Sequence, residues 1–324
     1  MKTKIGAAAL AAFVCGAAFA QLAVTPAVPD KAWTRKMWLP RFDAKKALAG
    51  QGGYDVVFLG DSITHGWETA GAKVWAENFE GGAYKALNCG FSGDRTEHLL
   101  WRLQNGQLAG LRPKAFVVMI GTNNTGHRDA EAEPPTDTIL GIQSAVDWLV
   151  DNYPESKVVL HPIFPRGAAV DDPLRVRNDL VNREIRAFAD GKTVLWCDFN
   201  SRLLATNGVM EASMAKDLLH PGEDGYRIWA RELKPFLDYA LGLSGKAPKS
   251  SAPPAPTALA ANASTATTPR IKQCWLNLRG GKGFPPRIRQ KRAEQCANAD
   301  RYYDAVLIGD SITHFWEQIG RAHV

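Results

Sequence analysis

Short runs of β-branched and other apolar residues alternate with longer amphipathic runs from about Asp55 onward, and this alternation limits what the chain can fold into. Four to six consecutive apolar residues fit a buried strand, whereas an apolar residue at every third or fourth position fits one face of a helix. We predict strands at 55–59, 84–88, 115–120, 157–161 and 193–197, and helices at 95–104, 137–152, 174–189 and 223–241. This order of elements favours a parallel sheet with helices on both faces.

Folds of this kind bind ligands just outside the carboxyl ends of their strands, so the residues that follow each strand are the candidates for chemistry. The run GDSI at 60–63 follows the first strand, NCGFSGDRT at 88–96 closes the second, GTNN at 121–124 follows the third, and DLLH at 217–220 precedes the last helix. These runs supply a serine, a glycine amide, an asparagine amide, and an aspartate three residues before a histidine. Acyl transfer needs these groups, although each run alone also fits a turn or a helix cap.

Together, the four runs resemble the blocks of the SGNH, or GDSL, hydrolase superfamily, and the doubled asparagine of GTNN resembles its platelet-activating-factor acetylhydrolase-like branch. The resemblance covers about residues 30–242. It implies a flavodoxin-like three-layer α/β/α fold with a five-stranded parallel sheet, the SGNH hydrolase fold. The chain departs from the usual pattern at Ile63, where GDSL has leucine, and at Asn124, where many members carry aspartate.

The resemblance also implies roles for individual residues. Ser62 would be the nucleophile, His220 the general base, and Asp217 the group that orients the imidazole. The amides of Ser62 and Gly93 and the side chain of Asn123 would form the oxyanion hole, with each donor lowering the barrier by about 3 kcal/mol. We expect no cofactor and no metal ion, because the remaining histidines do not fall at ligand spacing.

Two other classes of protein are alternatives to a serine carboxylic ester hydrolase. A metal-dependent phosphoesterase would use Asp61, an asparagine of GTNN, His127 and His220. Such a site needs more carboxylate and histidine ligands on adjoining loops than we find in the sequence. A non-catalytic carbohydrate-binding module would leave the filled acyl-transfer positions unexplained. We therefore favour an acetylesterase-like enzyme of short acyl esters.

An acylated carbohydrate such as acetylated xylan is the substrate that the sequence favours, as for an acetylxylan esterase, with a lysophospholipase or short-chain lipid esterase as the alternative. The argument for a sugar rests on a secreted context and on tryptophans, whose faces stack on sugar rings but more often pack in cores. These tryptophans lie at 33, 38, 67, 75 and 101. Residues 21–245 carry 25 Lys and Arg against 28 Asp and Glu, so despite the overall charge of +6 we expect no nucleic-acid partner. The sequence carries no signal for an oligomeric state.

The N-terminus has the features of an export signal. Two lysines, an apolar run at 5–14 and the small residues around position 20 predict a secretory signal peptide at 1–20 that is cleaved after Ala20. The apolar run is too short to span a membrane. We therefore expect a secreted or periplasmic protein without a membrane span.

The last third of the chain predicts a linker and a partial repeat. Residues 21–242 form the predicted hydrolase domain, and the Pro-, Ala-, Ser- and Thr-rich stretch at 243–270 a linker. Residues 303–317 match residues 54–68 at 11 of 15 positions, so 271–324 is predicted to be the truncated start of a second hydrolase domain. Ser311 has no partner equivalents after it and is not expected to be catalytic. Cys274 and Cys296 would form a disulfide or remain free thiols.

Overall fold

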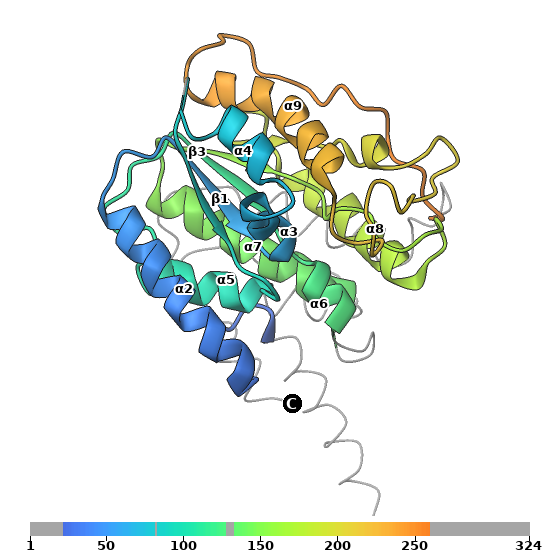
Figure 1. The fold of residues 1–324 in the computed structure, drawn as a ribbon, viewed down its shortest axis with the longest axis horizontal. Helices are drawn as coiled ribbons and strands as arrows, with labels where there is room; N and C mark the ends of the chain where they lie inside the picture. Colours follow the sequence, from blue (N-terminus) through green and yellow to red (C-terminus); the bar gives the residue numbers. More distant parts are fainter. Residues whose placement is uncertain (1–21, 82, 128–132, 260–324) are drawn as a thin grey trace, which may run out of the picture.

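Five parallel strands form a single sheet in the computed structural model, which describes residues 22–81, 83–127 and 133–259 (Figure 1). The strand order is β2-β1-β3-β4-β5. The strands are β1 (Val56–Gly60), β2 (Ala86–Gly90), β3 (Ala115–Met119), β4 (Lys157–Leu160) and β5 (Val194–Trp196). Each lies within two residues of its predicted position, so the predicted five-stranded parallel sheet is confirmed.

Helices cover both faces of this sheet because each strand sends alternate apolar side chains to opposite sides. Val57 and Leu59 point into one core, which α5 (Thr96–Gln104), α7 (Pro135–Asn152) and α8 (Pro173–Ile185) cover. Val56 and Phe58 point into the other, which α4 (Ala72–Asn78) and α9 (Glu223–Ala240) cover. The result is the predicted three-layer α/β/α arrangement (Figure 1).

In the described part of the chain, four α-helices were not predicted from the sequence: α2 (Ala32–Gly50), α3 (Ser62–His65), α4 and α6 (Thr122–His127). The apolar period of α2 is weak, because the buried apolar side chains described in its 19 residues are those of Trp38, Phe42 and Ala49. Pro40, which disfavours a helix prediction, also lies inside it. Helices α3, α4 and α6 have only four to seven residues, too few to establish a period. These short helices nevertheless carry or adjoin the candidate site.

The strand order places the site. The chain moves from β1 to β2 on one side and then returns to β3 on the other side of β1, so the connections diverge at the carboxyl end of β1. Ser62 follows β1, Gly93 follows β2 and Asn123 follows β3, so all three lie at the same edge of the sheet. This is the edge where such folds bind ligands.

The stretch predicted to be a linker has neither helix nor strand over 243–259, yet it contacts the domain. The Ser250 hydroxyl donates to the carbonyl of Trp196 and accepts from the amide of Asp198, and the Thr257 hydroxyl donates to Asp179. Ser250 thereby satisfies polar backbone groups at β5, an edge strand. The predicted signal peptide, Cys274, Cys296, Ser311 and the predicted partial second domain lie outside the described residues.

Within the described part of the chain, no helix is both long and apolar enough to cross a bilayer. Cys89 and Cys197 are buried free thiols there, and burial raises the pKa of both.

Candidate active site

Ser62 begins the short helix α3, which turns sharply away from the end of β1. Asp61 caps this helix, because its Oδ1 accepts the amide hydrogen of Ile63 at 2.9 Å. The two paired strand ends, β1 and β2, both finish in glycine, which leaves room for the turn. A Cβ at Gly60 would lie 2.1 Å from Thr64 Oγ1, and a Cβ at Gly90 would lie 2.2 Å from the backbone nitrogen of His65. Both positions therefore require glycine, and their missing side chains allow Ser62 to sit at the sheet edge.

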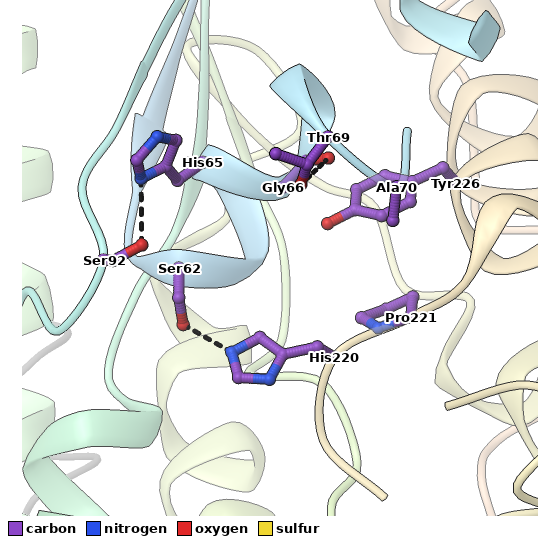
Figure 2. Close-up of a pocket in the computed structure, with 9 residues that line it drawn as sticks. All are labelled: Ser62, His65, Gly66, Thr69, Ala70, Ser92, His220, Pro221 and Tyr226. Atoms are coloured by element: carbon purple, nitrogen blue, oxygen red, sulfur yellow. Dashed lines mark hydrogen bonds between the residues drawn. The ribbon is translucent and has the colours of Figure 1, made fainter. Parts of the chain in front are cut away.

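His220 and Asp217 come from the loop before α9. Ser62 Oγ lies 2.8 Å from His220 Nε2, and His220 Nδ1 lies 2.6 Å from Asp217 Oδ2 (Figure 2). The three groups that the sequence predicted to work together thus form one hydrogen-bonded row, although 158 positions separate the serine from the histidine.

Asp217 shapes its own loop while it contacts the imidazole. Its Oδ1 accepts the amide hydrogens of Leu219 and His220. Leu218, which directly follows Asp217, adopts a left-handed φ of 58°. Burial alone would raise the pKa of Asp217, but the hydrogen bonds from the ring and backbone of His220 outweigh it and lower the pKa. Asp217 is therefore a carboxylate that fixes both the turn and the orientation of the histidine.

The three predicted oxyanion donors belong to separate elements at the same edge of the sheet. Among the residues that the structure describes, the amides of Ser62 and Gly93 donate to no protein acceptor. Gly93 has a φ of 80°, and a Cβ there would meet nothing within 4 Å. The side-chain amide of Asn123 donates one hydrogen to the carbonyl of Asp94 at 2.9 Å, which leaves its second hydrogen for another acceptor.

A buried ion pair holds the loop that carries Gly93. The carboxylate of Asp94 accepts from Trp38 Nε1 at 2.6 Å and from Arg102 Nε at 2.9 Å, and neither Asp94 nor Arg102 is exposed. Arg102 also lies 4.0 Å from the centre of the Phe91 ring. Because the carbonyl of Asp94 also accepts from Asn123, this one residue connects α2, α5 and α6 to the glycine loop. This role of Asp94 was not predicted from the sequence, since charged residues are seldom fully buried.

Asn124, where many family members carry aspartate, serves the same framework. Its Oδ1 accepts the amide hydrogen of Thr96, and its Nδ2 donates to Glu133 Oε1 at 2.6 Å. All three residues are buried. The departure from the family pattern therefore lies in the packing behind the site.

Asp61 is a fully buried carboxyl directly before the nucleophile. Its Oδ1 caps α3, while its Oδ2 has no hydrogen-bond partner among the described residues. Burial, followed by the negative charge of Asp94, raises the pKa of Asp61 to about 7 even though the Ile63 amide lowers it. Asp61 thus holds its proton in the folded protein at pH values where it would be ionised in the unfolded chain.

We expect this carboxyl to make the protein less stable as the pH rises. Because its folded pKa is about 7 against 3.8 for an ordinary aspartate, the free energy of unfolding should fall between about pH 4 and pH 7, by up to about 4 kcal/mol. In Asp61→Asn, which keeps the capping oxygen, that part of the pH slope should disappear. Urea denaturation at pH 5 and pH 8 measures the free energy of unfolding of both proteins. An equal change between the two pH values in wild type and Asp61→Asn would contradict the raised pKa of Asp61.

A cavity of about 240 Å³ opens beside Ser62 and His220. Figure 2 shows His65 and Ser92 on one side of Ser62, with Thr69, Ala70, Pro221 and Tyr226 on the other. Apart from Ser62 and His220, the residues that line the cavity were not predicted from the sequence to belong to the site. Two signals were available: His65 lies three positions after Ser62 on the same short helix, and Ser92 directly precedes Gly93.

The tryptophans that favoured a sugar are packed inside the protein. Trp38, Trp67 and Trp75 are at most 9% exposed and lie in clusters of aromatic rings, and Trp101 packs against Trp38 and Phe42. Trp38, Trp67 and Trp75 therefore provide no stacking platform, whereas Trp101 is only partly buried. The side chain of Trp33 lies outside the described part.

His161 is buried as well. It accepts from Trp229 Nε1, its Nδ1 lies 2.7 Å from the Cys197 carbonyl, and burial lowers its pKa to about 4. Over the described ranges, no group of three or more His, Cys, Asp or Glu side chains is arranged to hold a metal ion.

A serine, a histidine and an aspartate in one hydrogen-bonded row form the arrangement that serine hydrolases use. Residues 58–228 match the model of the GDSL-like Lipase/Acylhydrolase family. Human platelet-activating factor acetylhydrolase IB subunit alpha1 is 36% identical over 184 residues, which cover 56% of this chain and 75% of that protein. The rat alpha2 subunit is 31% identical over 196 residues, covering 60% and 80%.

Solved structures share the fold. A Streptococcus pneumoniae protein described as a platelet activating factor superposes with a TM-score of 0.54 at 20% identity, covering 63% of this chain and 94% of that one. A Bacteroides fragilis protein described as an acylhydrolase gives 0.51 at 22% identity, covering 65% and 100%. The chain belongs to the GDSL-like lipase/acylhydrolase family, within the SGNH superfamily, and is a carboxylic ester hydrolase.

Proposed function

We propose that the protein is a serine esterase that removes short acyl groups, acetyl foremost, through an acyl-enzyme at Ser62. The observation that carries this proposal is the continuous row from Ser62 Oγ through the His220 ring to Asp217, with contacts of 2.8 and 2.6 Å. His220 takes the proton of Ser62 as its oxygen attacks the ester carbonyl carbon. The Ser62 and Gly93 amides and Asn123 receive the negative charge on the former carbonyl oxygen.

The second half of the reaction uses the same groups. His220 returns the proton to the departing alcohol, whose bond to the acyl carbon breaks. A water molecule then attacks the acyl-enzyme with His220 as base, and the carboxylic acid leaves while Ser62 recovers its proton. Asp217 remains ionised and stabilises the imidazolium in both halves.

The small size of the cavity supports a short acyl group. A volume of about 240 Å³ lies below the range of about 300 to 1,000 Å³ typical of small-molecule sites, so it suits an acetyl group and a compact alcohol better than a long chain. The mammalian relatives are named acetylhydrolases, which agrees with this size argument. Export to the periplasm or the medium stays a proposal from the N-terminal sequence alone.

A p-nitrophenyl ester series in the presence of EDTA tests the proposal. We expect kcat/KM to fall at least 10-fold from acetate to octanoate, because the longer chain exceeds the cavity, and we expect EDTA to have no effect. A fluorophosphonate probe should modify Ser62, as located by mass spectrometry of the peptides. Equal rates for octanoate would contradict the short-acyl preference. Loss of activity with EDTA, or modification elsewhere, would contradict the serine mechanism.

A further inference from the structure

A second serine–histidine hydrogen bond lies in the same cavity as the first. Ser92 Oγ is 2.9 Å from His65 Nδ1, while Ser62 Oγ is 2.8 Å from His220 Nε2, and all four residues line the cavity (Figure 2). The proposed reaction uses Ser62 and His220 and leaves His65 and Ser92 without a role.

Both residues are anchored to the reaction centre by the backbone. His65 ends α3, the helix that Ser62 begins, and Ser92 directly precedes Gly93 of the proposed oxyanion loop. A group held by this pair therefore lies close to the ester under attack.

The chemistry of the pair is neutral. Burial, followed by the positive charge of Arg41, lowers the pKa of His65, so the ring is uncharged at neutral pH. Glu68 Oε2 lies 3.7 Å from His65 Nε2. Burial would raise the pKa of Glu68, but hydrogen bonds from Arg41 and Lys45 lower it to about 2. This carboxylate favours a proton on Nε2, which leaves Nδ1 to accept the hydroxyl hydrogen of Ser92.

The remaining hydrogen-bonding capacity is that of an acceptor. When Ser92 donates to His65, the lone pairs of its oxygen are free to accept a hydrogen from a bound molecule. No Lys, Arg, Asp or Glu is among the described residues that line the cavity, and the nearby Arg41 and Lys45 are already paired with Glu68. The wall suits a neutral hydroxyl group.

The other side of the cavity is largely apolar, which indicates that the hydroxyl bound by His65 and Ser92 belongs to the alcohol part of the substrate. Ala70, Pro221 and the ring of Tyr226 lie there, and the Tyr226 hydroxyl already donates to the carbonyl of Ile63 at 2.7 Å. An acetyl group has no hydrogen to donate, so its methyl fits the apolar side and the polar side faces the alcohol.

We propose that His65 and Ser92 form a subsite for a hydroxyl group of the alcohol, adjacent to the scissile ester. The substrates are then short-acyl esters of polyhydroxylated alcohols, such as sugars, rather than of phospholipids. The assignment rests on the proposed esterase function of Ser62.

Two esters that differ by one hydroxyl test the subsite: cyclohexyl acetate and trans-cyclohexane-1,2-diol monoacetate. We expect the wild type to prefer the diol ester in kcat/KM by about 3- to 10-fold, as one net hydrogen bond allows. In Ser92→Ala this ratio should fall to about 1. Thr69→Val removes a hydroxyl from the opposite wall, where it donates to Gly66, and should keep the wild-type ratio.

A wild type without preference, or a preference that survives in Ser92→Ala, would overturn the subsite. An acetylated phosphocholine lipid hydrolysed with a kcat/KM at or above that of the diol ester would overturn the substrate class. Failure of the proposed function at Ser62 has a different result, because Ser62→Ala would then still hydrolyse both esters.

Discussion

Ser62→Ala should lose esterase activity by about 10⁴- to 10⁶-fold in kcat, because the variant has no oxygen to form the acyl-enzyme. The residual rate would come from the oxyanion donors and from binding, which the substitution leaves in place. Steady-state hydrolysis of p-nitrophenyl acetate measures the loss, and a denaturation curve shows that the variant is folded. We expect KM to change far less than kcat.

The chain supplies its own matched control. Ser311 lies in the same tetrapeptide, GDSI, within a segment that repeats 11 of 15 residues around Ser62. Ser311→Ala should retain wild-type activity, because Ser62 is the serine whose oxygen lies 2.8 Å from His220 Nε2. A Ser62→Ala enzyme with more than a few per cent of wild-type activity would exclude Ser62 as the nucleophile. Loss of activity in Ser311→Ala would contradict the expectation that Ser311 is not catalytic.

The parts of this site that could be predicted from the sequence are those with strong local signals. The strands before Ser62 and Asn123 are unbroken apolar runs, and α7 shows a full helical period, with Ile139, Ile142 and Val146 buried on one stripe. Asp217 and His220 are three residues apart, so one turn brings them together. Local periodicity was therefore enough to predict the sheet, and short spacing to pair Asp217 with His220. The grouping of Ser62 with this pair came from the resemblance to the family, because 158 positions separate the serine from the histidine.

The support around the site could not be predicted, because it depends on contacts between distant segments. Trp38 reaches Asp94 across 56 positions, and His65 reaches Ser92 across 27. The sequence also gives no sign that Arg102 is fully buried, since such a side chain is stable inside only beside a partner that the fold brings to it. In the same way, three of the tryptophans that suggested a sugar platform, Trp38, Trp67 and Trp75, are buried.

Gly90→Ala should damage both the stability and the activity of the protein, because the new methyl group has no space. Its Cβ would lie 2.2 Å from the nitrogen of His65 and 2.4 Å from the carbonyl carbon of Thr64, and both atoms belong to the backbone of α3. Relief requires α3 to move relative to β2, and Ser62 begins that helix. We expect the free energy of unfolding to fall by about 3 kcal/mol or more. The folded fraction should lose activity by about 100-fold, as a shift of about 1 Å in the nucleophile implies.

Gly50→Ala is the matched control for this substitution. Gly50 is the last residue of α2, and a Cβ there would meet nothing within 4 Å. Alanine at a helical position that it can adopt without strain should leave the activity unchanged and stabilise the protein by up to about 1 kcal/mol. Urea denaturation and p-nitrophenyl acetate hydrolysis of both variants make the comparison. If Gly90→Ala matched Gly50→Ala in both measurements, the close approach of β2 to α3 would not be what positions Ser62, and the role of the paired strand-end glycines would have to be abandoned.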